Sequence, residues 1–157
     1  MLVALVLVVA TIVLFKNGAS ATPGDSRAEA LSSQYGAVTK AARTETEAFI
    51  EVDYKFMDEL IAKVLAGATG TFKEEYSRVK ATLKATAQQG QSISTGTVRE
   101  VGIGDIDDDN AVVFVAADAK VSNKSTKGVA QPRSYRLKLN MTRTGDKWLI
   151  SNLQFVR

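Results

Sequence analysis

Side chains that could do chemistry are scarce in this chain, and most of them are carboxylates. The 157 residues include no His and no Cys. The chain therefore has no thiol nucleophile, no disulfide, no imidazole acid–base group and few of the usual ligands of zinc or copper. A serine or carboxylate enzyme stays possible, but the side chain that most often moves protons near neutral pH is missing. The sequence predicts a protein that is not an enzyme and holds no cofactor.

Two pairs of neighbouring carboxylates, Asp58/Glu59 and Glu74/Glu75, are the first places where acid–base chemistry could occur. A catalytic pair needs one carboxyl in an apolar pocket, because the pocket separates the two pKa values. Both pairs instead fall between the apolar positions of helical patterns. A solvated helix face is the favoured interpretation.

The acidic run from Asp105 to Asn110 resembles the start of a calcium-binding loop. A twelve-residue loop of that kind needs Gly at its sixth position and Glu at its twelfth. Counted from Asp105, these positions hold Asn110 and Ala116. The run is predicted to be an exposed turn between two strands, and no metal site is predicted.

Overall composition is that of one folded domain. The chain is 45% hydrophobic and 24% charged, with 20 basic and 17 acidic residues. These charges are interspersed, and no Lys/Arg block suggests a nucleic-acid partner.

The first fifteen residues are apolar or nearly so, and Lys16 follows at once. As a helix they would span about 22 Å, less than the ~30 Å hydrocarbon core of a membrane. A cleaved signal peptide, with Ala19-Ser20-Ala21 as its cleavage site, competes with an uncleaved single-pass anchor that begins further upstream. The anchor over residues 1–15 is preferred, followed by a linker over 16–24, and both interpretations place the rest outside the cytoplasm. The predicted anchor residues are Leu2, Val3, Leu5, Leu7, Val9, Ile12, Leu14 and Phe15.

The next segment carries three helical patterns, over residues 25–50, 54–66 and 71–89. The apolar stripes are Leu31, Tyr35, Val38, Ala42 and Phe49 in the first, Phe56, Met57, Leu60, Ile61, Val64 and Leu65 in the second, and Phe72, Tyr76, Val79 and Leu83 in the third. Asp25 or Ser26, Asp53 and Thr71 are the predicted N-caps, with Thr71 and Glu74 forming a capping box, and Gly67 ends the second helix.

After Gln91 the pattern changes to strands, predicted over residues 94–104, 110–122, 133–143 and 147–156. In the third, Tyr135, Leu137, Leu139 and Met141 alternate with the polar residues Ser134, Arg136, Lys138, Asn140 and Thr142, as in a half-buried antiparallel sheet. Gly145-Asp146 suits a two-residue hairpin, and Trp148 is expected to anchor the sheet to the helices. The residues predict an α+β domain over 25–157, with helices packed on a curved four-stranded antiparallel sheet.

Two long motifs then point to a family. They are the run "DY…VL…ATGTFKEEY" from Asp53 to Tyr76 and the terminal "GDKWLISNLQFV" from Gly145 to Val156. In their order and spacing the chain resembles the Mce-associated membrane proteins of actinobacteria, accessories of mammalian-cell-entry operons. The resemblance implies a single-pass membrane protein whose extracytoplasmic domain has the cystatin-like or nuclear-transport-factor-like fold, also found in an assembly subunit of type IV secretion systems.

The leading function implied by that resemblance is a non-catalytic accessory subunit that assembles or stabilises an Mce-type lipid or sterol transporter in the cell envelope. Its partners would be Mce proteins and permease subunits, and Arg136 and Lys138 form a candidate interaction face. An alternative is a lipid- or sterol-binding module with a pocket between helices and sheet, lined by Tyr54, Phe56, Phe72, Phe114 and Trp148. A ketosteroid-isomerase-like enzyme is the remote third hypothesis, since the inward side of the sheet offers no clear carboxylate base.

Overall fold

The computed structural model describes residues 23–156, so the predicted anchor and most of the predicted linker lie outside the described residues. Among the residues that are described, no helix is both long enough and apolar enough to cross a membrane. By its internal contacts the chain divides into two units, residues 1–34 and 35–157.

Helix α2 (Pro23–Ile50) begins earlier than predicted, because Pro23 and Gly24 belong to its first turn and not to the linker. Proline suits a first turn, where its missing N–H has no partner to lose. The predicted apolar stripe is only partly buried. Leu31 and Tyr35 are 45% and 44% exposed, whereas Val38 and Ala42 are fully buried. The helix therefore packs on the sheet through its second half.

Helices α3 (Met57–Ala66) and α4 (Gly70–Gly90) follow. Both predicted caps are wrong. The carboxylate of Asp53 accepts a hydrogen bond from the Lys55 N–H, and Phe56 occupies the N-cap position of α3 without a side-chain bond. Thr69 takes the corresponding position in α4, which leaves Thr71 inside the helix. Some side chains of the predicted stripes are exposed: Phe56, Val79 and Leu83 are 53%, 44% and 37% exposed.

The sheet has five antiparallel strands in the order of the chain. They are β1 (Val52–Asp53), β2 (Ile93–Ile106), β3 (Asn110–Ser122), β4 (Gln131–Thr144) and β5 (Lys147–Phe155). The prediction of four strands missed β1, whose two residues pair with Ser94 and Ile93. Two residues are too few to show an alternating pattern, so no sequence period reveals such a strand.

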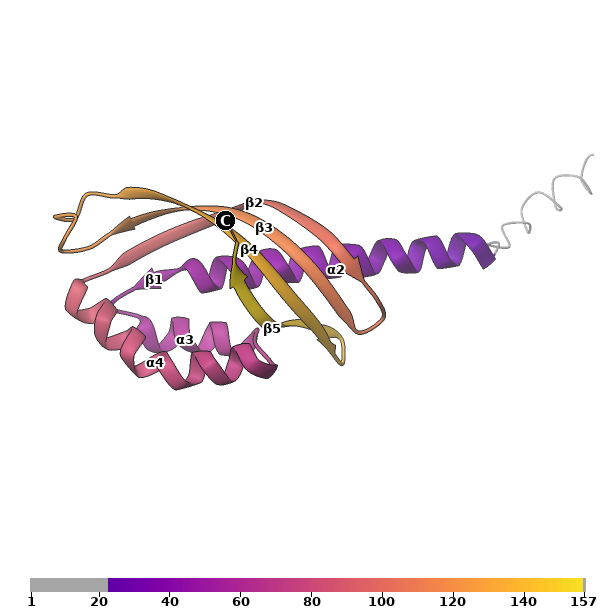
Figure 1. Cartoon of the computed structure of the whole chain (residues 1–157), viewed down its shortest axis with the longest axis horizontal. Helices are drawn as coiled ribbons and strands as arrows, with labels where there is room; N and C mark the ends of the chain where they lie inside the picture. The colour runs from indigo at the N-terminus through magenta and orange to yellow at the C-terminus, as the bar shows by residue number, and fades with distance from the viewer. Residues whose placement is uncertain (1–22, 157) are drawn as a thin grey trace, which may run out of the picture. The chain divides into compact units, whose positions relative to one another are not determined.

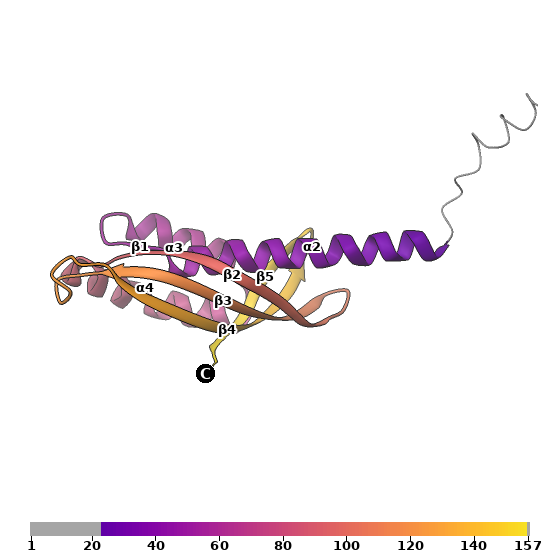
Figure 2. The ribbon, with the colours of Figure 1, turned by 90° about the horizontal axis from the view of Figure 1, so that it is seen from above.

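One face of the sheet carries the core, as Figure 1 and Figure 2 show by the helices gathered on that side. The core side chains on this face pack against the buried side chains of the second half of α2. On β4, Leu137, Leu139 and Met141 are at most 1% exposed, which confirms the predicted alternation of that strand. Trp148 is 6% exposed and belongs to the same cluster, as predicted.

Interruptions in pairing bend the strands over the helices. Register shifts occur between Val98 and Glu100, between Ile103 and Asp105, and between Asn140 and Met141. Each extra residue leaves the ladder locally and increases twist. The strands consequently arch across the helical layer, visible in Figure 1.

The Gly67–Gly70 turn joins α3 to α4 and is fastened to β5. The N–H of Thr69 donates to the carbonyl of Ile150 at 2.8 Å, and the N–H of Ile150 donates to the carbonyl of Gly67 at 2.9 Å. Gly67 ends α3 as predicted, but with φ at −91° and not with the positive φ that usually selects glycine there. The backbone conformation therefore does not explain why glycine occupies this position.

The two predicted hairpin turns are confirmed. Asp107 accepts hydrogen bonds from the N–H groups of Asp109 and Asn110 at 2.9 and 2.7 Å, which closes the acidic turn between β2 and β3. Gly145 and Asp146 connect β4 to β5, and Gly145 has φ at +60°. The described residues contain no cluster of acids arranged to hold a metal.

Candidate functional site

The predicted pocket residues do not meet in one cavity. Phe72 and Trp148 are buried in the main core, and Tyr54 is half-buried against the small cluster of Met57, Ile61 and Ala87. Phe56 is exposed, and Phe114 points to the opposite face of the sheet because strand residues alternate.

Aromatic rings also fill the space between the helices and the sheet. Phe49 of α2 lies 5.9 Å from Phe72 and 6.3 Å from Tyr76, measured between ring centroids, and 6.2 Å from Phe155 of β5. Burial raises the pKa of the Tyr76 hydroxyl. These side chains pack against one another and do not line a binding cavity.

The predicted interaction residues Arg136 and Lys138 lie on the face of the sheet that no described helix covers, named here the outer face. Across β3 from them are Glu100 and Gly102 of β2. Arg136 is exposed and Lys138 is half-buried. Their outward orientation is therefore as predicted.

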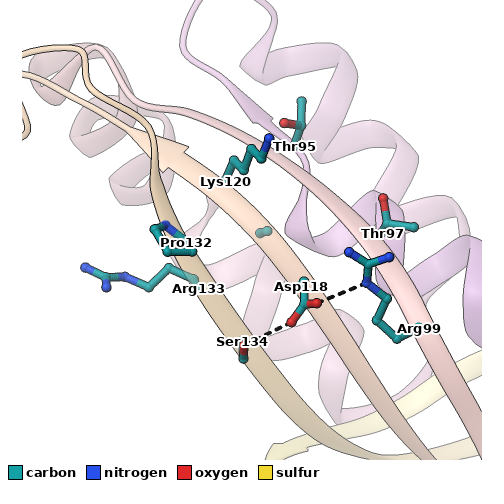
Figure 3. Close-up of a pocket in the computed structure, with 9 residues that line it drawn as sticks. Thr95, Thr97, Arg99, Asp118, Lys120, Pro132, Arg133 and Ser134 are labelled. Atoms are coloured by element: carbon teal, nitrogen blue, oxygen red, sulfur yellow. Dashed lines mark hydrogen bonds and ion pairs between the residues drawn. The ribbon is translucent and has the colours of Figure 1, made fainter.

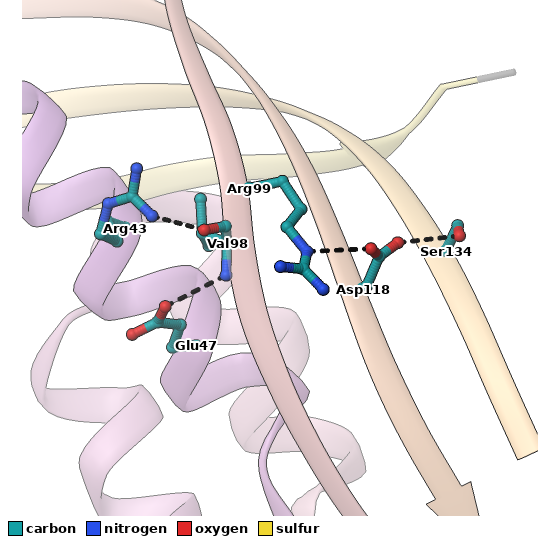
Figure 4. Close-up of polar contacts among 6 residues, drawn as sticks. All are labelled: Arg43, Glu47, Val98, Arg99, Asp118 and Ser134. Atoms are coloured by element: carbon teal, nitrogen blue, oxygen red, sulfur yellow. Dashed lines mark hydrogen bonds and ion pairs between the residues drawn. The ribbon is translucent and has the colours of Figure 1, made fainter.

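A hollow of about 390 Å³ lies on this outer face, toward the ends of β2, β3 and β4 (Figure 3). Its lining residues are Thr95, Thr97, Arg99, Asp118, Ala119, Lys120, Pro132, Arg133 and Ser134. Arg99 Nε donates to one carboxylate oxygen of Asp118 at 3.0 Å, and the Ser134 hydroxyl donates to the other at 2.9 Å. The three side chains form a row across three strands, as Figure 4 shows.

Asp118 is held in its charged form. The hydrogen bond from Ser134, and then that from Arg99, lowers the pKa of this carboxyl below its usual value. Lys120 and Arg133 form no ion pair within residues 23–156. The hollow therefore has a net positive charge and offers hydrogen-bond donors to an anionic group.

Arg99 is the extra residue of the first bulge in β2, between Val98 and Glu100. Val98, just before it, points into the core and is 2% exposed. Its backbone groups at the sheet edge are bound by α2: the Val98 N–H donates to Glu47 Oε1 at 3.1 Å, and the Arg43 guanidinium donates to the Val98 carbonyl (Figure 4). Arg43 and Glu47 thus occupy the place of a neighbouring strand and protect this part of the edge.

A second site is a groove of about 610 Å³ between α2, the end of α3 and the β4–β5 turn. Its lining is Ala37, Lys40, Ala41, Thr44, Glu45, Ala48, Lys63, Ala66, Gly67, Asp146, Lys147, Trp148 and Leu149. Small apolar side chains and Trp148 form the walls, and three lysines surround them.

Glu45 is the unusual titratable group of this groove. Burial raises the pKa of its carboxyl, and the charges of Lys63 and Lys147 partly oppose that rise. Its carboxylate also explains Gly67, because a Cβ on Gly67 would lie 1.5 Å from Glu45 Oε2. Sequence reasoning missed Glu45, although it shares a helical face with Ala41 and Ala48, four residues before and three after it.

Comparison with known proteins gives the family. A family model described as "Uncharacterized protein Rv1363c/MT1408-like" matches residues 1–157. The chain belongs to this family. Uncharacterized protein Rv1363c of Mycobacterium tuberculosis (strain ATCC 25618 / H37Rv) is 30% identical over 105 residues, which are 67% of this chain and 40% of that protein. This member of the Rv1363c/MT1408-like family thus matches less than half of its relative's length.

Two solved structures share the fold. CagV, a VirB8 homologue of the type IV secretion system of Helicobacter pylori, has a TM-score of 0.61 at 5% identity and covers 77% of this chain and 97% of its own. The periplasmic domain of DotI has a TM-score of 0.61 at 10% identity and covers 77% and 94%. At such identities the likeness concerns the fold alone. It confirms that this α+β arrangement is shared with type IV secretion proteins, as the family resemblance implied.

Proposed function

We propose that this protein is a non-catalytic accessory subunit of the cell envelope that assembles or stabilises an Mce-type lipid or sterol transport system. The observation that carries the proposal is the filled interior. Leu137, Leu139 and Ile150 are at most 1% exposed, and aromatic rings occupy the space between helices and sheet. A domain built this way acts through its surfaces, and the two hollows described above are open to the exterior.

Two further facts support a role in assembly. The fold is that of CagV, a VirB8 homologue of a type IV secretion system, and of the periplasmic domain of DotI. The motifs from Asp53 to Tyr76 and from Gly145 to Val156 resemble those of Mce-associated proteins. The proposal includes a folded domain outside the cytoplasm, a membrane anchor over residues 1–15, and Mce proteins and permease subunits as partners.

Purification from detergent-solubilised membranes tests this proposal. The tagged full chain should recover Mce or permease subunits, and cells expressing the untagged chain provide the control. Deleting the gene should lower the amounts of those subunits and the uptake of lipid together. Unchanged subunit amounts and unchanged uptake, with no subunit recovered, would overturn the proposal.

A second candidate function is binding of a lipid or sterol in the groove that contains Glu45. Its favouring observation is the combination of an apolar wall, including Trp148, with Lys40, Lys63 and Lys147 at the rim. Such a site suits an amphipathic molecule, whose apolar part would lie on the alanines and whose polar part would meet the charges.

The test compares two exposed alanines on neighbouring helices. Ala66→Trp fills the groove, whereas Ala85→Trp places the same ring on α4, outside the lining of the groove. A fluorescent fatty acid and a fluorescent sterol should bind saturably to the wild-type chain and to Ala85→Trp, and more weakly to Ala66→Trp. Equal binding by both variants would exclude the groove as the site.

A further inference from the structure

The centre of the outer face carries an exposed aromatic ring. Phe114 of β3 is 46% exposed there, and its strand neighbours are Gly102 of β2 and Lys138 of β4. The ring lies against Gly104, where a Cβ would come within 2.8 Å of the ring atom Cε2. The next outward residue of β3 is the small Ala116. Small residues on the β2 side and along β3 leave the ring open to contact with another surface.

Charges flank this centre with opposite signs on its two sides. Glu100 of β2 is the register partner of Ala116, and Ala116 is the register partner of Arg136 of β4. One row across the sheet therefore runs acid, alanine, base. Both charged side chains are exposed, and neither forms an ion pair within the described part of the chain.

We propose that the outer face binds a second copy of this chain, face to face, about a twofold axis that runs along β3. Rotation about such an axis exchanges the β2 side with the β4 side. Each Glu100 then lies opposite the partner subunit's Arg136, which gives two ion pairs related by symmetry, and the two Phe114 rings meet beside the axis. A twofold contact uses the same patch on both copies, so the patch must be complementary to itself. The acid–alanine–base row meets that requirement.

Other features of the face agree with this occupant. Strands β2, β3 and β4 contain 14, 13 and 14 residues. At a rise of about 3.3 Å per residue and a spacing of about 4.8 Å between strands, their outer face has a projected area of roughly 600 Å². The arch of the strands turns the ends of this face away from a facing sheet, so the contact is smaller than the roughly 800 Å² that each partner buries in a standard interface, and the dimer is weak. A wholly acidic partner would match Arg136 but repel Glu100, whereas a second copy offers an opposite charge to both side chains.

The same rotation brings like charges on β3 toward each other, the two Asp118 side chains and the two exposed Lys120 side chains, which is the electrostatic cost of the arrangement. Each Asp118 already has an ion pair with Arg99 and a hydrogen bond from Ser134, so much of its charge is compensated. The arch of the strands in Figure 1 also carries this end of the face away from the centre.

Charge exchange tests the pairing. In the full chain, purified in detergent, Glu100→Arg and Arg136→Glu should each weaken the dimer by about tenfold or more, because each places like charges opposite one another in both pairs. The combined variant, Glu100→Arg with Arg136→Glu, restores opposite charges and should return the dissociation constant to within about threefold of the wild type. Lys80→Glu, an exposed charge reversal on α4, is the control and should leave the dimer unchanged. Analytical ultracentrifugation measures association, and circular dichroism verifies that each variant is folded.

Crosslinking tests the location. Because the chain has no Cys, a single Ala116→Cys variant gives a unique thiol beside the proposed axis. Facing sheets lie about 10 Å apart, beyond the reach of a disulfide, so a short bismaleimide is the suitable reagent. Ala116→Cys should crosslink to itself in membranes, and Ala85→Cys on α4 should not. Any of three outcomes would overturn the proposal: a monomeric wild type, a combined variant that fails to regain the dimer, or crosslinks of Ala116→Cys only to other proteins. These outcomes do not depend on whether the protein serves an Mce transporter.

Discussion

The two faces of the sheet are built by the same strands and differ at every second residue, yet their physical roles are opposite. On the inner face, Leu137, Leu139 and Met141 are almost fully buried beneath the helices. On the outer face, Arg136 and Lys138 alternate with them and stay in contact with water. The buried side chains that stabilise the fold lie on the inner face, and the outer face carries the exposed charges.

The same contrast appears in two carboxyl groups whose pKa values move in opposite directions. Glu45 lies between α2 and the β4–β5 turn, where burial raises its pKa. Asp118 lies on the outer face, where hydrogen bonds from Ser134 and Arg99 lower its pKa. Local surroundings, and not the type of residue, decide which form of a carboxyl the fold favours.

The largest expected difference between the faces is in stability. Leu139→Ala removes a fully buried side chain and should lower the free energy of unfolding by about 2–5 kcal/mol, because it loses apolar burial and leaves a cavity. Lys138→Ala, the adjacent residue on the other face, should change it by less than about 0.5 kcal/mol. Urea unfolding of both variants measures the contrast. Equal losses of unfolding free energy in the two variants would show that the Lys138 side chain is also packed against the protein.

The edge of the sheet should show an intermediate effect. Glu47→Ala leaves the Val98 N–H without its acceptor, and we expect a loss of about 1–2 kcal/mol in unfolding free energy and faster hydrogen exchange at that amide. Glu51→Ala is the matched control, since it breaks only an exposed ion pair with Lys63 and should cost less than about 1 kcal/mol. Unchanged exchange at Val98 would refute the role given to Glu47.

The two carboxyl groups should give stability profiles of opposite slope with pH. Since the folded-state pKa of Glu45 is raised, the unfolded chain releases this proton first, and stability falls as pH rises above the ordinary value of 4.5. Since the folded-state pKa of Asp118 is lowered, its contribution is present above 3.8 and is lost as pH falls toward the folded-state value.

Urea midpoints measured across this range should separate the two groups. Glu45→Gln should remove the fall in stability above pH 4.5. Asp118→Asn should remove the loss of stability below pH 3.8. A Glu45→Gln profile parallel to that of the wild type would mean that this carboxyl is not buried in solution.

The smallest effect is expected for the ion pair on the outer face. Arg99 and Asp118 have side chains that are 64% and 48% exposed, so Arg99→Ala should cost less than about 1 kcal/mol, and salt should reduce that cost further. By NMR titration, Ser134→Ala and Arg99→Ala should each raise the pKa of Asp118, because both side chains stabilise its carboxylate. An unchanged pKa in either variant would mean that the missing side chain does not bind the carboxylate in solution.

Much of the fold was predictable because it follows from local periods. Alternation on β4, the glycine turn at Gly145 and the acidic turn at Asp107 all depend on residues close together in the chain, and all are confirmed. The caps at Asp53 and Thr71 failed, because pairing of β1 with β2 and fastening of the Gly67–Gly70 turn to β5 decide where α3 and α4 begin. Those contacts join distant segments and leave no local pattern.

The candidate sites divide in the same way. Arg136 and Lys138 were found because an outward position on a strand follows from its alternation alone. Glu45 was not found, since its burial depends on the end of α3 and on the β4–β5 turn, which bring Lys63 and Lys147 to it. By itself the sequence determined the class of the domain, the inward and outward sides of its strands and the scarcity of catalytic groups. Only the tertiary structure decided which charges meet, because pairing across strands and packing of helices set those distances.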